Sequence, residues 1–192
     1  MIFMIFYTFL NENSKHAEQH EIAYRLLSEG VKRLYGITSR SFEKGEHGKP
    51  FFKEYPEIKF NISHCSGLAV CGISGGEIGV DAELIRPYNG KVMRRIFSER
   101  EQNYILFSEN SERDFFRFWT LKECFGKAIG TGIFSDLKNY SFEISDDIEK
   151  NPQCEKIPDK IFTQKIIQKK WVVSVCADSP ENEFEFIDTD KN

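Results

Sequence analysis

The chain lacks the paired cysteines on which disulfide-stapled and zinc-binding domains depend. Its 192 residues include five cysteines, an odd number, and none of them forms a C-x-x-C pair. This pattern argues against a disulfide framework and a structural zinc site, and it fits a reduced, cytoplasmic setting. The glycine-rich loops of Walker-type and Rossmann-type nucleotide folds are absent too, so neither fold is expected.

An excess of positive charge is also missing. The chain carries 26 Lys and Arg residues against 30 Asp and Glu residues, which gives a net charge of −4. Proteins that bind nucleic acids generally show a basic surface, so we expect no nucleic-acid partner. Any anionic ligand must therefore be held by a local group of cations.

The apolar segment at residues 1–10 is too short to span a bilayer, which takes about 20 residues in a helix. It also lacks the basic start and the small-residue cleavage site of a signal peptide. We interpret this segment as a buried first strand, and we expect no membrane association.

Enough apolar residues are present for a sizeable core, since 40% of the chain is hydrophobic and 18 residues are Phe. Their spacing predicts a helix over residues 15–35 that stops at Gly36. A second long helix is predicted over 112–128, with Ser111 as its N-cap and Gly130 just past its end. The other predicted elements are a polar loop at 38–50, strands at 60–63, 67–73, 78–84, 140–144 and 171–177, and a helix at 98–108.

A faint internal repeat indicates two similar halves. Residues 60–63, Phe-Asn-Ile-Ser, resemble residues 142–145, Phe-Glu-Ile-Ser. We therefore expect a mixed α+β fold with two similar α+β halves. The predicted halves are residues 1–86 and 98–192, joined by a connector at 87–97, and they should form one compact monomer.

Three carboxylates and one lysine are candidate residues of a functional site. Asp81 and Glu83 project from the same face of a predicted strand, and Glu123 and Lys127 stack one turn apart on a predicted helix. Neighbouring carboxylates repel each other unless a cation or a proton intervenes. Mg²⁺ takes carboxylate oxygens and leaves positions for phosphates. The pattern suggests a site for Mg²⁺ and pyrophosphate, while a solvated strand face and an ordinary helical ion pair are the alternatives.

A second group of polar residues could bind a phosphate. Ser63 and His64 end a predicted strand just before a turn, where a hydroxyl, an imidazole and free backbone N–H groups would meet. A turn cap with a partly exposed histidine is the alternative. Lys49 precedes Pro50 on a rigid turn, and taken alone this pattern favours an ordinary surface loop over a binding site.

Four segments of the chain, in this order, resemble the Sfp-type 4'-phosphopantetheinyl transferases. They are Gly48–Pro50, Phe60–His64, Gly79–Glu83 and Trp119–Lys127, the last followed by Gly130-Thr131-Gly132. Phe97-Ser98 followed by Glu101 matches a further element of that family. The resemblance implies that the chain moves the 4'-phosphopantetheine arm of coenzyme A onto a serine of an apo acyl or peptidyl carrier protein and releases adenosine 3',5'-bisphosphate. It also implies an α+β fold of two pseudo-symmetric halves, each a small antiparallel sheet packed with a long helix, with the site between the halves.

The resemblance assigns roles to the charged residues. Asp81, Glu83 and Glu123 would hold Mg²⁺, or Mn²⁺ with similar oxygen ligands, against the pyrophosphate. Lys127 would contact a phosphate and offset the charge of the leaving group. Either Glu123 or, less favoured, Glu101 would take the proton of the incoming serine.

The resemblance also implies where coenzyme A lies. Ser63 and His64 would bind its 3'-phosphate, and Lys49 with Pro50 would lie near its adenine. The outer basic contacts stay open between three candidates: Lys15, His20 and Arg25.

A docking surface is expected in the connector. Carrier proteins of this kind present an acidic helix beside the modified serine, and the connector mixes apolar groups with three cations, Lys91, Arg94 and Arg95. A solvated helix end is the equal alternative. Two other functions compete with the transferase: a non-catalytic module that binds coenzyme A or a carrier, and a metal-dependent phosphohydrolase.

Overall fold

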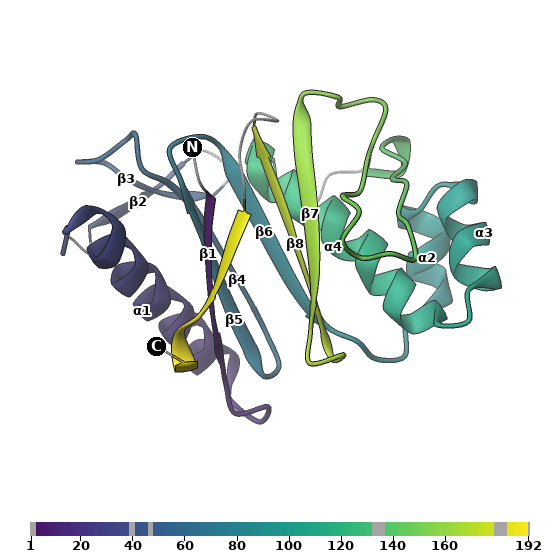
Figure 1. Ribbon diagram of the computed structural model, residues 1–192, viewed down its shortest axis with the longest axis horizontal. Coiled ribbons are helices and arrows are strands. Elements are labelled where there is room, and N and C mark those ends of the chain that lie inside the picture. The colour runs from purple at the N-terminus through teal and green to yellow at the C-terminus, as the bar shows by residue number, and fades with distance from the viewer. Residues whose placement is uncertain (1–2, 39–40, 46–47, 132–136, 179–183, 192) are drawn as a thin grey trace.

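The computed structural model describes residues 3–38, 41–45, 48–131, 137–178 and 184–191. In these residues the chain is a mixed α+β structure, with two small β-sheets side by side and one long helix packed against each (Figure 1). The predicted fold class is therefore confirmed. Residues 1–2 of the predicted first strand and Gly132 of the glycine motif lie outside the described residues.

The first sheet has the strand order β4 (Lys59–Cys65), β5 (Leu68–Ser74), β1 (Phe3–Phe9) and β9 (Phe184–Asp188). β1 pairs antiparallel with β5 but parallel with β9, a pairing that was not expected. Helix α1 (His16–Tyr35) packs on this sheet through an apolar stripe that includes Leu26, Leu27 and Val31. It ends at Gly36, whose φ of 71° is the left-handed conformation that glycine adopts readily, as predicted.

The second sheet is antiparallel, in the order β6 (Ile78–Leu84), β8 (Trp171–Asp178) and β7 (Lys160–Ile167). Helix α4 (Ser111–Ile129) packs against β6 and β8. The predicted N-cap is wrong by one residue, because Asn110 accepts the hydrogen bond from the Arg113 N–H and Ser111 is already helical. Gly130 ends the helix in the left-handed conformation, as predicted.

The remaining elements are short. They are β2 (Phe42–Lys44), β3 (Pro50–Phe52), α2 (Gly90–Ile96), α3 (Glu99–Phe107) and two 3₁₀ turns at Leu137–Asn139 and Thr189–Lys191. Helix α2 lies in the predicted connector, and α3 matches the predicted helix at 98–108.

Several predicted elements were wrong. In the described part of the segment at 38–50, β2 and β3 form a hairpin, because Phe42 packs against Phe52 and Phe60. The segment at 140–144 is not a strand, since one isolated bridge joins Glu143 to Gln153. Strands β7 and β9 were not predicted.

The strand pairing crosses the predicted division into halves. β6 precedes the connector yet pairs with β8, while β9 follows it and pairs with β1. One apolar cluster contains side chains from both sheets, among them Val70, Val80 and Val173. The two sheets therefore share a core. The boundaries at 86 and 98 and the monomeric state stay predictions.

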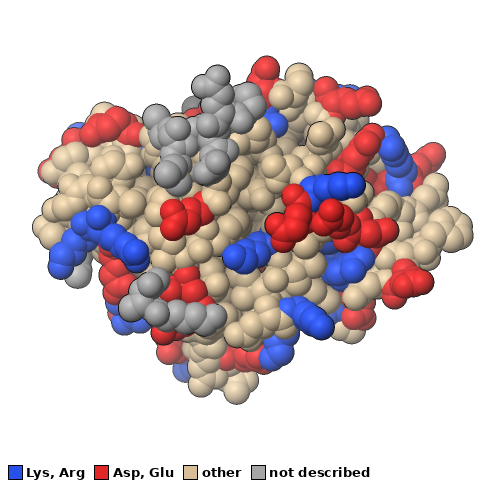
Figure 2. All heavy atoms as spheres, in the orientation of Figure 1, with Lys and Arg blue, Asp and Glu red and all other residues tan. Residues whose placement is uncertain are grey.

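The surface carries charges of both signs. Acidic and basic side chains are interspersed on the face seen in Figure 2, in keeping with the small net charge. Among the helices of the described residues, none is apolar over a length that could cross a bilayer.

Candidate active site

Helix α4 lies very close to β6 at Gly79. A Cβ atom at this position would lie 2.0 Å from the Cys124 carbonyl oxygen and 2.4 Å from the Ala128 nitrogen. Any side chain larger than hydrogen would force helix and strand apart. Gly79 therefore allows the acidic residues that follow it on β6 to lie next to the last turns of α4.

Asp81 sits at the centre of this contact. The residue is 5% exposed, and its Oδ1 lies 2.7 Å from Lys127 Nζ of α4. The Ser63 hydroxyl of β4 donates to the same oxygen at 3.0 Å, and it accepts hydrogen bonds from Lys127 Nζ at 3.0 Å and from the Ala82 N–H at 3.2 Å. Three elements, β4, β6 and α4, thus meet at one carboxylate oxygen.

The other oxygen of Asp81 fits a cation. Oδ2 is buried and has no hydrogen-bond partner among the described residues. A buried carboxylate oxygen without a partner is costly, and a divalent cation with oxygen ligands would remove that cost.

Glu123 and Glu83 add negative charge around Asp81. Burial, followed by the charges of Asp81 and Glu83, raises the pKa of Glu123 to about 7, although Lys127 opposes the shift. Burial is also the main cause that raises the pKa of Glu83, with Asp81 adding to it and Arg86, whose Nη1 lies 2.8 Å away, opposing it. Asp81 and Glu83 thus influence the titration of Glu123, and Asp81 influences that of Glu83.

The three carboxylates do not form a complete set of metal ligands in this structure. Among the described residues, no three histidine, cysteine or carboxylate side chains stand together at metal-ligand spacing. Instead, Lys127 neutralises Asp81 and Arg86 neutralises Glu83. The donor chemistry suits Mg²⁺, while the positive charge at this site comes from two side chains of the chain itself.

His64 belongs to a cluster of three imidazoles. Its ring centroid lies 4.8 Å from that of His16 and 6.0 Å from that of His20, and its Nδ1 lies 3.3 Å from the amide oxygen of Gln19. Burial and the charges of the two histidines and Lys127 lower the pKa of His64 to about 4. His64 is therefore neutral at pH 7 and acts as a hydrogen-bonding group.

The sequence interpretation missed His16. The signal available was the spacing of His16 and His20, four residues apart on one helix face. Of the three candidates for an outer contact, the structure places His20 beside His64. The residues His16, His20 and His64 are called the histidine cluster below.

Lys49 has a packing role that the sequence did not predict. Its Nζ donates to Glu77 Oε2 at 2.7 Å, to the Ile78 carbonyl at 3.3 Å and to the Ala128 carbonyl at 2.9 Å. The last bond caps the C-terminal end of α4, where cations are favourable. The ammonium group is thus committed to the protein, and a contact between adenine and the turn at Pro50 stays a prediction.

Glu101, the less favoured candidate for the proton acceptor, is held in a network of structural contacts. It is fully buried, its Oε1 lies 3.0 Å from Lys122 Nζ and 3.0 Å from the Phe142 nitrogen, and its Oε2 accepts from the Ser98 N–H at 2.7 Å. The carboxylate closes a capping box at the start of α3 and pairs with a buried lysine. Both carboxylate oxygens are used in these contacts, which gives Glu101 a structural role in joining α3 to α4.

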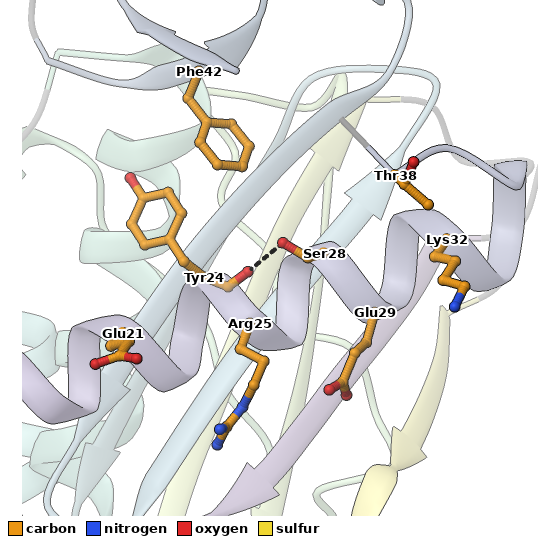
Figure 3. Close-up of a pocket in the computed structure, with 8 residues that line it drawn as sticks. All are labelled: Glu21, Tyr24, Arg25, Ser28, Glu29, Lys32, Thr38 and Phe42. Atoms are coloured by element: carbon orange, nitrogen blue, oxygen red, sulfur yellow. Dashed lines mark hydrogen bonds between the residues drawn. The ribbon is translucent and has the colours of Figure 1, made fainter. Parts of the chain in front are cut away.

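A separate cavity of about 490 Å³ opens between α1 and β2 (Figure 3). The rings of Tyr24 and Phe42 lie 5.2 Å apart on one side of it, and Arg25 and Glu29 point away from those rings. The ring of Tyr24 lies 4.7 Å from His20, so the cavity adjoins the histidine cluster. None of the three carboxylates Asp81, Glu83 and Glu123 lines it.

Comparison with known proteins identifies the family. A model of the 4'-phosphopantetheinyl transferase superfamily matches residues 77–176, which span β6, α4 and most of β8. A 4'-phosphopantetheinyl transferase of Bacillus subtilis is 26% identical over 174 residues, with 88% of this chain and 78% of that protein covered.

Two further relatives carry related names. The 4'-phosphopantetheinyl transferase Sfp of Bacillus subtilis strain 168 is 27% identical over 156 residues, or 79% of this chain and 70% of Sfp. The 4'-phosphopantetheinyl transferase gsp of Aneurinibacillus migulanus is 35% identical over 152 residues, with 70% of this chain and 63% of that protein covered. The family model spans the strand and the helix that meet at Asp81, and the chain belongs to the 4'-phosphopantetheinyl transferase superfamily.

Proposed function

We propose that this chain transfers the 4'-phosphopantetheine group of coenzyme A to the hydroxyl of a serine on an apo acyl or peptidyl carrier protein. The other product is adenosine 3',5'-bisphosphate. Membership of the superfamily supports the reaction class. The observation that carries the proposal is the meeting of Lys127, Asp81 and Glu123 where α4 crosses β6.

The reaction needs little covalent chemistry from the protein. The serine oxygen forms a bond to the phosphorus that carries the arm, and the bond from this phosphorus to the bridging oxygen of the pyrophosphate breaks. Positioning and neutralisation of charge supply most of the rate in such transfers. Lys127 is the cation closest to the carboxylates, and its ammonium group would stabilise charge on the departing phosphate.

Glu123 is the proposed proton acceptor. An effective general base has a pKa near the working pH, and burial beside two carboxylates brings the pKa of Glu123 to about 7. The serine proton would pass to its carboxylate as the new bond to phosphorus forms. Asp81 is less suited, because Lys127 and Ser63 already occupy one of its oxygens.

Asp81, Glu83 and Glu123 would hold Mg²⁺, with Mn²⁺ as a substitute. The unpartnered Oδ2 of Asp81 supports this assignment. When bound, the ion would neutralise the pyrophosphate. Ser63 and the histidine cluster would lie at the 3'-phosphate of coenzyme A, since Ser63 shares the Lys127 ammonium with Asp81.

The carrier protein would dock on α2. Lys91, Arg94 and Arg95 are exposed there, whereas Met93 turns into the core. Three cations on one short helix complement an acidic helix and would guide its approach. All five cysteines are free thiols, which supports a reduced compartment such as the cytoplasm.

Intact-mass spectrometry tests the proposed function. The chain is incubated with coenzyme A, Mg²⁺ and a panel of fatty-acid, polyketide and nonribosomal-peptide apo carriers. We expect at least one carrier to gain the mass of one phosphopantetheine group on its serine. Release of free phosphopantetheine to water would instead indicate a phosphohydrolase, and binding without any modification would indicate a non-catalytic module.

A further inference from the structure

The histidine cluster brings three imidazoles from two elements together at one edge of the first sheet. His16 and His20 lie one turn apart on α1, and both are exposed. His64, near the end of β4, is half-buried, and its ring centroid lies 4.8 Å from that of His16 and 6.0 Å from that of His20. A ligand that approaches from solvent would therefore meet the two rings of α1 first.

Neutral groups of α1 and β5 surround the cluster on one side. The amide oxygen of Gln19 lies 3.3 Å from His64 Nδ1, and the ring of Tyr24 lies 4.7 Å from that of His20. Burial raises the pKa of Tyr24, so its hydroxyl stays protonated at and below pH 8. Strand β5 packs against both α1 and β4, and burial also raises the pKa of its Cys71 thiol. Neither group changes charge near neutral pH.

On the other side, a permanent cation acts on the cluster from α4. The charge of Lys127 lowers the pKa of His64, together with burial and the two other histidines. The Lys127 ammonium is already held by Asp81 Oδ1 of β6 at 2.7 Å and by the Ser63 hydroxyl of β4 at 3.0 Å. Glu123 of the same helix also feels this charge. Carboxylates thus neutralise the lysine in part, and further positive charge at the cluster must come from the imidazoles.

The charge of such a cluster changes close to neutral pH. Histidine is the residue type whose ordinary imidazole gains a proton between pH 8 and pH 5, and the protonated ring has two N–H donors. We propose that His16 and His20 bind the 3'-phosphate of coenzyme A through their protonated rings, so that the affinity for this phosphate rises as the pH falls from 8 to 6. This inference rests on the proposed function.

An anion is the ligand that the cluster fits best. Positive charges close together repel one another unless an anion lies between them, and a phosphate could accept hydrogen bonds from both rings. A metal ion is less suited, since no three ligand side chains in the described part of the chain stand at metal-ligand spacing. Lys15, exposed just before His16, is the competing cation of α1, whereas Arg25 points away from the ring of Tyr24 (Figure 3).

Calorimetry with two ligands tests the inference. Dephospho-coenzyme A lacks the 3'-phosphate but keeps the pyrophosphate, so the ratio of its Kd to that of coenzyme A isolates the phosphate. Titration of Glu123, whose pKa is about 7, would affect the pyrophosphate in both ligands. We expect this ratio to fall at least about tenfold from pH 6 to pH 8, as two charge-assisted hydrogen bonds are weakened. The phosphate itself gains negative charge over this range, which would change the ratio in the opposite direction.

Two double variants separate charge from structure. His16→Gln with His20→Gln should lower the ratio at pH 6 and make it independent of pH. His16→Lys with His20→Lys places permanent charges at the same positions, so the ratio should stay high at pH 8. A purely structural role of the exposed rings would not give opposite results for glutamine and lysine. The matched control is Arg33→Gln, an exposed cation in the last turn of α1, which should leave the pH dependence unchanged.

The inference is overturned by a wild-type ratio that stays constant between pH 6 and pH 8, or by a slope that persists in both double variants. It is also overturned if Lys15→Gln abolishes the preference for coenzyme A while the double glutamine variant retains it, since Lys15 would then supply the charge. If the wild-type chain shows the expected pH dependence but modifies no carrier, the proposed function fails while this inference stands.

Discussion

The ammonium group of Lys127 lies 2.7 Å from Asp81 Oδ1, and this contact joins α4 to β6 at the centre of the site. The same group lies 3.0 Å from the Ser63 hydroxyl of β4. One lysine therefore links the second sheet and its helix to an edge strand of the first sheet. The ammonium group of Lys127 could therefore contact a phosphate group while it stays beside the carboxylates that would hold the metal ion.

Removing this charge should impair catalysis. In Lys127→Met, we expect kcat to fall by about 10²-fold or more, since one preorganised charge at a developing oxyanion has an effect of this size. The KM for the carrier should stay the same, because α2 is unchanged. Steady-state kinetics with an apo carrier measures both. A kcat within a factor of three of wild type would contradict the role given to Lys127.

The raised pKa of Glu123 predicts a stability that depends on pH. Its pKa is about 7 in the folded chain against an ordinary value near 4.5, so between these values the folded chain keeps a proton that the unfolded chain has lost. Stability should therefore fall as the pH rises through this window. Glu123→Gln removes the fall, and its Tm should exceed that of wild type by a few degrees at pH 8 but not at pH 4.

Thermal unfolding in EDTA gives this comparison. An equal Tm difference at both pH values would contradict the assignment of the titration to Glu123. Adding Mg²⁺ at pH 8 should raise the Tm of wild type more than that of Glu123→Gln, because ligand binding to the folded state stabilises it.

Glu101 should act on stability and not on proton transfer. In Glu101→Gln the buried Lys122 loses its counter-charge, and we expect the free energy of unfolding to fall by about 3–5 kcal/mol. The double variant Glu101→Gln, Lys122→Met should recover much of the loss. Chemical denaturation measures both.

The double variant also tests the chemistry. Once it is folded, it should transfer the arm at a rate within several-fold of wild type. A folded double variant whose kcat had dropped a thousandfold would restore Glu101 as a candidate base.

Charge reversal on α2 should weaken binding of the carrier protein but not binding of coenzyme A. We expect Arg94→Glu with Arg95→Glu to raise the KM for the carrier about tenfold or more at low salt and to leave the KM for coenzyme A unchanged. The matched control is Lys32→Glu with Arg33→Glu, an exposed basic pair in the last turn of α1. If both pairs had the same effect on the carrier, α2 would not be the docking surface.

The parts of the fold that could be predicted have strong local signals. The apolar stripes and glycine stops of α1 and α4 depend on neighbouring residues, so both helices were located within one or two residues. The alternation along β6 placed Asp81 and Glu83 on one face, and the structure shows that both influence Glu123.

The remaining features depend on contacts that no local pattern records. Strand β9 exists because it pairs with β1, more than 170 residues earlier in the chain. Lys49 caps α4 through the Ala128 carbonyl, 79 positions away, and Glu101 is buried only because Lys122 and residues near Phe142 fold over it. Sequence spacing identifies such residues as chemically capable, while their burial decides whether they can act.

The sharing of one divalent ion by Asp81, Glu83 and Glu123 is tested most directly by Mn²⁺ binding in the presence of coenzyme A. Electron paramagnetic resonance distinguishes free from bound Mn²⁺, which takes the same oxygen ligands as Mg²⁺. We predict one Mn²⁺ per wild-type chain and at least a tenfold loss of affinity in each of Asp81→Asn, Glu83→Gln and Glu123→Gln. Unchanged Mn²⁺ affinity in Glu123→Gln would show that strand and helix do not hold a common ion.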